Sequence, residues 1–246
     1  MRKLISVFIF VSWTLPHFLS GQDYLIDIKH YGIEEGLSHR NVHFALQDRR
    51  GLMWFGTDYG LNRFDGYNFK WITKEKHDLQ SNQVKSALSD KDGLLWLMYG
   101  SAMNYAKWSP IIHGIDIFNP ITDEVTSFED FVEGKTQFQA TDIHSFTQKE
   151  TGEIVFLTKK MQLLTYELDG TFKVVDLENQ YNGITNFLWS ENGYFWLSVL
   201  EGNQISIVAI DEKGEEIHHL SPDEPFTCVL PYKVQDNQNV KWIATF

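Results

Sequence analysis

The 246-residue chain has little basic charge, one cysteine and, beyond its N-terminus, no long apolar run. Its 21 Lys and Arg residues are outnumbered by 33 Asp and Glu residues, so the formal net charge is -12 at pH 7. Such a chain lacks the basic surface that nucleic-acid binding requires, and an anionic membrane surface would repel it. The single Cys228 excludes an internal disulfide framework. After the N-terminus, no apolar stretch is long enough for a transmembrane helix.

The N-terminus has the composition of an export signal. Arg2 and Lys3 precede an apolar run over 4–15, and small polar residues follow at 20–22. A positive start, a short apolar region and a cleavage zone are typical of a secretory signal peptide. The run is too short to span a bilayer comfortably, and no cysteine near it could carry a lipid. We therefore expect a signal peptide over 1–22 and the mature protein over 23–246.

A short pattern recurs five times along the chain. Each copy has an aliphatic residue, then a turn residue nine positions later, then an aromatic or aliphatic residue three positions after the turn. A glycine in the turn permits positive φ, and a tryptophan in the next strand would bury a large area against a neighbouring sheet. The predicted structural residues of the repeat are Gly51, Trp54, Gly93, Trp96, Gly152, Gly193, Trp196 and Trp242.

Two further strand patterns follow each copy, so the repeated unit is four strands with turn residues between them. The units recur roughly every 40–60 residues, which is the size of a propeller blade. No stretch has a convincing amphipathic helical pattern. The predicted fold is all-β, a β-propeller of four-stranded antiparallel blades, and a β-sandwich with similar hairpins is the alternative. The predicted blades span approximately 37–72, 79–128, 138–176, 181–220 and 225–246.

The two ends of the repeat region predict an incomplete propeller of about four and a half blades. Residues 24–31 have the pattern of an outer strand whose blade partners lie elsewhere. Residues 240–246 have the pattern of a second strand with no third or fourth strand after it. An open sheet edge and an uncovered apolar blade face would favour aggregation, so we expect further blades to complete the domain.

The first copy is the most complete and carries a family resemblance. It contains GLS at 36–38, GLMWFGT at 51–57 and GLNRFDG at 60–66. This stretch closely resembles the two-component regulator propeller repeat, found in the periplasmic sensor region of hybrid two-component systems and related sensor kinases of Bacteroidetes-type bacteria. The second copy keeps Asp90, Gly93 and Trp96 but loses other parts of the motif. Later copies keep mainly the turn and the apolar positions.

The resemblance implies a ligand-sensing module of a larger signalling protein. Such proteins have two propellers, a further β-sandwich, one transmembrane helix, and cytoplasmic kinase and regulator domains. The propeller would be exported to the periplasm, with the full-length parent anchored in the inner membrane, and would respond to glycans or oligosaccharides. The expected partners are an oligosaccharide or other small ligand, the downstream blades and the signalling domains. A homodimer of the full-length protein is compatible with this architecture.

No residue pattern indicates catalysis, a metal or a cofactor. His39 and His43 are four positions apart, but strand geometry does not bring their rings together as a helix would. Asp48, Asp90 and Asp236 recur at one turn position, which favours a structural role. The phosphate-loop, serine-hydrolase, zinc-protease and dithiol motifs are absent. We therefore predict no catalytic residue, metal site or cofactor. A carboxylate pair facing one glycosidic bond across the ring remains open.

A binding surface is expected where the loops of neighbouring blades gather. Amide and aromatic side chains suit sugars, which present apolar faces and many hydroxyls. Ordinary turn residues are the alternative interpretation, and two other functions stay open: an exported polysaccharide-active propeller enzyme and a plain binding or scaffold propeller. The candidate ligand-binding residues are His39, Arg40, Asn41, Asp58, Tyr59, Ser81, Asn82 and Gln83.

Export of the protein gives a direct test of the N-terminal assignment. Because a signal peptide is removed on translocation, the mature protein should begin near Gln22 or Asp23. N-terminal sequencing of the exported product measures this. Recovery of Met1 on a soluble cytoplasmic protein would show that the segment is not a cleaved signal.

Overall fold

The computed structural model describes residues 28–104, 109–177, 181, 183–201, 204–221, 229–235 and 241–245. Side chains are described in these ranges except at 101–112, 184–189, 204 and 229–245. The predicted signal at 1–22, Asp236 and Cys228 lie outside the described residues, as does the side chain of Trp242. The chain divides into two compact units, Met1–His30 and Tyr31–Phe246, and every described strand lies in the second.

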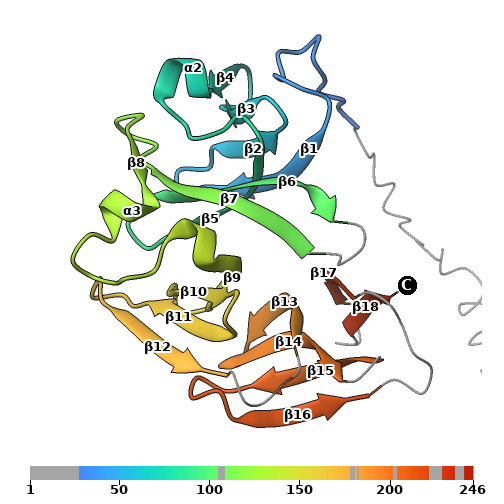
Figure 1. Ribbon diagram of the computed structural model, residues 1–246. Coiled ribbons are helices and arrows are strands. Elements are labelled where there is room, and N and C mark those ends of the chain that lie inside the picture. Colours follow the sequence, from blue (N-terminus) through green and yellow to red (C-terminus); the bar gives the residue numbers. More distant parts are fainter. Residues whose placement is uncertain are drawn as a thin grey trace, which may run out of the picture. The chain divides into compact units, whose positions relative to one another are not determined.

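The second unit consists of antiparallel sheets that follow one another along the chain (Figure 1). Within each sheet, strands that are neighbours in sequence are also hydrogen-bonded neighbours. The first sheet contains β1 (Val42–Gln47), β2 (Met53–Thr57), β3 (Gly60–Phe64) and β4 (Phe69–Ile72). The second contains β5 (Val84–Ser89), β6 (Leu95–Asn104), β7 (Ser109–Phe118) and β8 (Val125–Ser127).

Three more sheets complete the described part of the unit. The third contains β9 (Ile143–Gln148), β10 (Ile154–Thr158), β11 (Gln162–Tyr166) and β12 (Phe172–Asp176). The fourth contains β13 (Ile184–Glu191), β14 (Tyr194–Glu201), β15 (Gln204–Ile210) and β16 (Glu216–Leu220). The fifth contains β17 (Val229–Gln235) and β18 (Lys241–Thr245). We refer to these sheets as blades 1 to 5.

The arrangement of the blades is that of a β-propeller. The first strand of one blade lies beside the first strand of the next for β1 and β5, β9 and β13, and β13 and β17. The described helices are short and lie in connections: α2 (Lys74–His77), α3 (Phe128–Phe131) and the 3-10 helix η1 (Ala140–Asp142). Meandering four-stranded antiparallel sheets stacked in chain order define the propeller architecture. The predicted fold class is confirmed.

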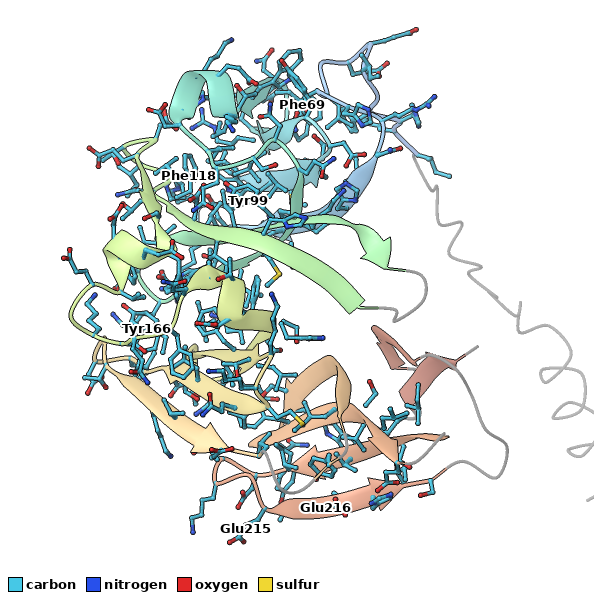
Figure 2. The ribbon with its side chains drawn as sticks, in the orientation of Figure 1. Phe69, Tyr99, Phe118, Tyr166, Glu215 and Glu216 are labelled. Carbon is cyan, nitrogen blue, oxygen red and sulfur yellow. The ribbon has the colours of Figure 1, made fainter. Side chains whose placement is uncertain are left out.

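Blade 2 buries both of its faces. In β6, Leu95, Leu97 and Tyr99 pack with blade 1, whereas Trp96 and Met98 pack with blade 3. Successive side chains of a strand point to opposite faces, so an unbroken apolar run fits a strand that lies between two cores. Figure 2 labels Tyr99 of β6 and Phe118 of β7, which belong to the cluster between blades 1 and 2.

Blade 3 is packed in the same way. In β10, Ile154 and Phe156 pack with blade 2, and Val155 and Leu157 pack with blade 4. Each large apolar side chain that is fully buried contributes roughly 1.5–3 kcal/mol. Among the residues whose side chains are described, the hydrophobic core is divided into three clusters, each lying between two consecutive blades.

An aspartate closes the first turn of blades 1 and 2 and also binds the tryptophan of the following strand. Trp54 Nε1 donates to Asp48 Oδ2 over 3.0 Å, and Trp96 Nε1 donates to Asp90 Oδ2 over 2.9 Å. In each turn the other carboxylate oxygen accepts two backbone N–H groups. Burial opposes ionisation of Asp48, but these hydrogen bonds lower its pKa below the usual value. Gly51 completes the first turn with a φ of 84°. The contacts give both aspartates a structural role.

Blade 3 lacks this aspartate–tryptophan pair. The strand registers place Lys149 and Val155 at the positions of Asp48 and Trp54. The turn still closes through its backbone, because Gly152 donates to the Lys149 carbonyl over 3.0 Å. Val155 is fully buried against blade 4.

Blade 4 has a tighter first turn. Only Asn192 and Gly193 join β13 to β14, and both have positive φ, as a two-residue hairpin requires. The register of β13 with β14 places Trp196 at the position of Trp54, because Ile184 pairs with Val199 as Val42 pairs with Thr57. Trp196 is half-buried, and its ring stacks on His218 with centroids 6.0 Å apart. In blade 5 the backbone register of Trp242 opposite Val234 matches that of Trp54 opposite Leu46.

The indole of Trp54 tests the contribution of this buried contact. Trp54→Ala should lower the free energy of unfolding by about 3–5 kcal/mol, because it empties a fully buried site. Trp54→Phe should cost about 1–3 kcal/mol, since Asp48 loses a buried donor. Equilibrium chemical denaturation measures both losses, with Tyr67→Ala, at an 88% exposed side chain, as the control. A Trp54→Phe variant as stable as the wild type would contradict a stabilising role for the hydrogen bond.

Candidate functional site

The loop residues expected to bind ligand come from three segments that meet at one end of blades 1 and 2. His39, Arg40 and Asn41 precede β1, Asp58 and Tyr59 form the turn between β2 and β3, and residues 81–83 precede β5. The segments are tied together, because the Gly60 amide donates to the carbonyl of Asn82 over 2.7 Å. The start of β1, the end of β2 and the start of β5 therefore bring these loops to the same place.

Asp58 is the centre of this group. Asn41 Nδ2 donates to Asp58 Oδ2 over 2.9 Å, and Lys85 Nζ donates to Asp58 Oδ1 over 2.6 Å. His43 Nε2 lies 2.7 Å from Asp58 Oδ1 and 2.8 Å from Lys85 Nζ. His39 lies at the edge, with Nδ1 4.0 Å from Asp58 Oδ2. Sequence reasoning did not identify Lys85 or give His43 a role, because their partner is distant along the chain.

The electrostatics of this cluster hold Asp58 ionised. Burial opposes ionisation, but hydrogen bonds from Lys85, Asn41 and His43 outweigh it and hold the pKa of Asp58 well below its usual range. One imidazole nitrogen cannot donate to Asp58 and accept from Lys85 at once. At 2.7 Å from the carboxylate, His43 Nε2 donates to Asp58 Oδ1, and Lys85 Nζ donates to the same oxygen. The cluster thereby joins β1 and the β2–β3 turn of blade 1 to β5 of blade 2.

The remaining predicted ligand residues are divided between internal contacts and exposed positions. Asn82 accepts the Lys74 amide over 2.8 Å and donates to Glu75 over 2.9 Å. Tyr59 is 43% exposed, with its ring 6.3 Å from that of Trp71. The Ser81 hydroxyl accepts the backbone amide of residue 83. Arg40 and Gln83 are exposed. Ligand binding by these residues stays a prediction.

A polar latch repeats beside these loops in blades 1 and 2. The Ser38 amide donates to Asn62 Oδ1 over 2.9 Å, and the Gln80 amide donates to Asp116 Oδ2 over 2.9 Å. The strand registers place Asn62 and Asp116 at equivalent positions of β3 and β7. Tyr99 also donates to Asp116, and burial raises the pKa of Asp116 above its usual value. We call this contact, from Ser38 to Asn62 in blade 1 and from Gln80 to Asp116 in blade 2, the polar latch. It fixes the segment that precedes the first strand of each blade.

Gly114 allows the second latch to close. A Cβ at this position would lie 2.0 Å from Gln80 Oε1, so a larger residue would displace the end of that side chain, which donates to Asp116. Gly114 pairs with Tyr99 between β7 and β6, and Gly60 pairs with Thr57 in the same way between β3 and β2 of blade 1. The glycine of the motif is thus retained in blade 2, although sequence comparison could not align it across the longer β6–β7 connection.

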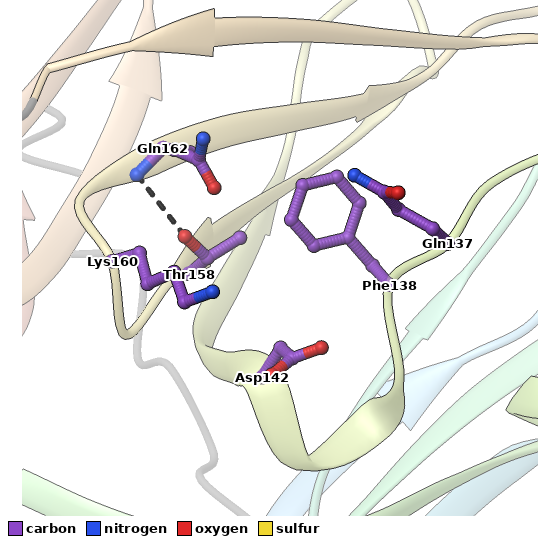
Figure 3. Close-up of a pocket in the computed structure, with 6 residues that line it drawn as sticks. All are labelled: Gln137, Phe138, Asp142, Thr158, Lys160 and Gln162. Carbon is purple, nitrogen blue, oxygen red and sulfur yellow. Dashed lines mark hydrogen bonds between the residues drawn. The ribbon is translucent and has the colours of Figure 1, made fainter.

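Blade 3 carries a pocket of about 340 Å³ at the corresponding end of its sheet (Figure 3). The lining comes from the segment before β9, the end of β10, the β10–β11 turn and the start of β11. None of these residues was among the candidates from sequence, because the third copy of the repeat is the most divergent. The lining residues are Gln137, Phe138, Asp142, Thr158, Lys160 and Gln162.

The walls of the pocket combine one aromatic ring with several polar groups. Phe138 is half-buried and packs against the core between blades 2 and 3. Thr158 is buried, and its hydroxyl accepts the Gln162 amide over 3.1 Å. Asp142 Oδ2 accepts the Gln139 amide over 3.0 Å. The arrangement can offer an apolar surface together with donors and acceptors to a small polar ligand.

The described part of the chain contains no group of three or more His, Cys, Asp or Glu residues that could hold a metal ion. In the same residues, none of the helices has both the length and the apolar character needed to cross a membrane.

The fold and the repeat define the class of protein, a β-propeller built from recurrent four-stranded blades. Residues 36–59 match the family model of the two component regulator propeller. The match runs from the segment before β1 to the β2–β3 turn, so the chain contains a two component regulator propeller repeat in blade 1. No protein of curated function matches the chain significantly.

Solved structures resemble the chain in fold. Virginiamycin B lyase from Staphylococcus aureus has a TM-score of 0.55 and 12% identity, with coverage of 82% of this chain and 62% of its own. A streptogramin B lyase has a TM-score of 0.54 and 14% identity, with coverage of 84% and 63%. The extracellular domain of a protein described as a hybrid two component system from B. thetaiotaomicron has a TM-score of 0.46 and 15% identity, with coverage of 79% and 32%. The chain spans less than two thirds of each of these proteins.

The Asp58 cluster predicts a specific pH dependence of stability. Because the pKa of Asp58 in the folded chain lies below the ordinary value of 3.8, its ionised carboxylate stabilises the folded chain above that pH. The stabilisation is lost as the pH falls below 3.8 toward the folded pKa. Asp58→Asn should therefore lose less free energy of unfolding than the wild type between about pH 6 and about pH 3.

Denaturant titrations across this pH range measure the effect. Glu150→Gln, which neutralises an exposed turn residue, should retain the wild-type slope. Parallel curves for the wild type and Asp58→Asn would show that the cluster adds no pH-dependent stability.

Proposed function

We propose that the chain is the ligand-sensing propeller region of an exported two-component signalling protein, and that its ligand is an oligosaccharide. The match of residues 36–59 to the two component regulator propeller carries the proposal. The export signal expected over 1–22 supports a periplasmic location, where the propeller would meet extracellular glycans. In the parent, binding would be read by signalling domains attached to the propeller.

The loop end of the blades supports a binding role. The blades hold their loops on a packed scaffold, and binding residues are commonly displayed on loops that a rigid scaffold positions. The blade 3 pocket opens at this end and offers an aromatic ring, amides and a hydroxyl. A pocket of that size lies at the lower end of the range for small-molecule sites.

An exported polysaccharide-active enzyme is the competing function. Such an enzyme needs two carboxylates facing one bond, in most glycosidase families. The well-buried carboxylates of the described residues are held by groups of the protein itself: Asp48 and Asp90 by turns and tryptophans, and Asp116 by the latch. Likeness to the lyases is at 12–14% identity and is a likeness of fold. The contacts therefore favour sensing over catalysis.

Binding and turnover by the purified 246-residue chain separate the two functions. The chain should bind at least one oligosaccharide saturably and be stabilised by about 2.7 kcal/mol at about 100 times the dissociation constant. Isothermal titration against a panel of plant, fungal and host-type oligosaccharides measures binding, and chromatography of the same mixtures measures turnover. Release of shortened or unsaturated products would show an enzyme. Failure of every oligosaccharide to bind would exclude glycan sensing by this chain.

A further inference from the structure

We propose that the blade 3 pocket binds one neutral pyranose unit of the glycan, with the ring of Phe138 as the platform. This inference rests on the proposed function and specifies both the site and the charge class of the sugar. It differs from the sequence-based expectation, which placed the ligand at the loops of blades 1 and 2.

The dimensions and the aromatic wall fit a single sugar ring. The pocket volume of about 340 Å³ suits one or two monosaccharide units rather than a long chain. Phe138 packs against the core between blades 2 and 3, which holds its ring in place, and the same ring lines the pocket (Figure 3). The C–H groups on one face of a pyranose can pack against such a fixed ring, which gives apolar contact at little entropic cost.

The polar wall suits hydroxyl groups. Gln137 and Gln162 each present an amide that both donates and accepts, which is what a sugar hydroxyl requires. Asp142 offers acceptor oxygens and Lys160 offers donors at other points of the rim. A set of mixed donors and acceptors around one aromatic ring can satisfy adjacent hydroxyls without any charged group on the ligand.

The charges favour a neutral sugar over an acidic one. The lining contains one carboxylate, Asp142, and one ammonium group, Lys160, so it presents no net charge to a ligand. The whole chain has a formal net charge of -12, which repels polyanions at long range. A uronate or sulfate would meet the Asp142 carboxylate as well as Lys160 and would gain little from entering.

The absence of the polar latch from blade 3 explains why a pocket can form there. The strand register places Leu164 where blades 1 and 2 have Asn62 and Asp116. A leucine cannot accept the amide of the entering segment. That segment is instead held through Asp142. The Asp142 side chain accepts the backbone amide of Gln139, and the Asp142 backbone carbonyl accepts the amide of Lys159 over 2.8 Å. The path of residues 137–142 leaves the space that the pocket occupies.

The turn that carries Lys160 is fixed by the backbone hydrogen bonds and the side-chain packing of Met161. Met161 has a φ of 58°, an uncommon conformation for a residue other than glycine. Its amide donates to the Thr158 carbonyl over 3.0 Å, and its carbonyl accepts the Leu177 amide over 2.9 Å. The Met161 side chain packs against the core between blades 3 and 4. Lys160 is therefore presented from a turn whose backbone is fixed before a ligand arrives.

Paired sugars that differ only in charge test the proposal on the full chain. The probes are D-galactose with D-galacturonate and D-glucose with D-glucuronate, together with the oligosaccharide that binds best in the panel. Saturation-transfer NMR and titration should show binding of at least one neutral sugar and at least about tenfold weaker binding of its uronate. Phe138→Leu, which keeps apolar packing on the core, should weaken neutral-sugar binding about tenfold and remove saturation transfer to the pyranose C–H protons. Gln162→Ala provides a second variant that leaves the core contacts of Phe138 in place.

Tyr67→Ala is the control, because Tyr67 is an 88% exposed aromatic residue in the β3–β4 turn of blade 1, outside both the pocket and the candidate loops. It should bind every probe as the wild type does. If an oligosaccharide binds but both pocket variants bind it normally, the pocket assignment is wrong while the sensor function stands. Tighter binding of the uronates would overturn the neutral-sugar assignment. If no sugar binds at all, the glycan part of the proposed function fails together with the pocket.

Discussion

Packing of each sheet against its neighbours is the interaction on which the rest of the structure depends. An antiparallel sheet commonly exposes one face to water, but blades 2 and 3 have apolar side chains on both faces of their second strands. Neither sheet could keep such faces in water by itself. The cost of exposing either face forces the blades into a stack, in which blades 2 and 3 are covered on both sides.

The stack determines where a functional site can lie. Because packing fixes the strands, the loops at one end of neighbouring blades lie close together. The hydrogen bond from the Gly60 amide to the Asn82 carbonyl joins two such loops of blades 1 and 2. In blades 1 and 2 the polar groups at this end are largely used to hold the blades to one another, through Asp58 and Asp116. In blade 3 Leu164 replaces the acceptor of the latch, and the entering segment takes a different path. A change in one structural residue thus accompanies the opening of a pocket.

The sequence predicted the fold well because the repeat encodes backbone and packing in the same few positions. Gly51 and Trp54 mark a turn and a buried contact that local rules recognise. The latch between Gln80 and Asp116 was not foreseen, since its partners are far apart in sequence and differ in type from Ser38 and Asn62. The pocket was also not foreseen, because its residues are spread over several segments. Its residues stand where the third copy departs from the repeat, and only the strand register shows that they share a space.

The loops of blades 1 and 2 illustrate a second limit of sequence reasoning. The structure brings the polar residues of these loops together, but the contacts of each side chain decide what it can do. Asp58 has the residue type and position of a ligand-binding group, yet it is held by Asn41, Lys85 and His43. Whether a polar loop residue remains available to a ligand depends on such long-range contacts, which composition and spacing do not reveal.

Hydrogen–deuterium exchange of the full chain, with and without a bound neutral oligosaccharide, tests the central claim most directly. The claim is that a packed stack of blades presents a sugar site in blade 3. Backbone amides in 137–142 and 158–162 should gain protection on binding, while those in 39–43, 58–60 and 81–85 should exchange at unchanged rates. Protection confined to the loops of blades 1 and 2, with no change around Phe138 and Lys160, would contradict the account.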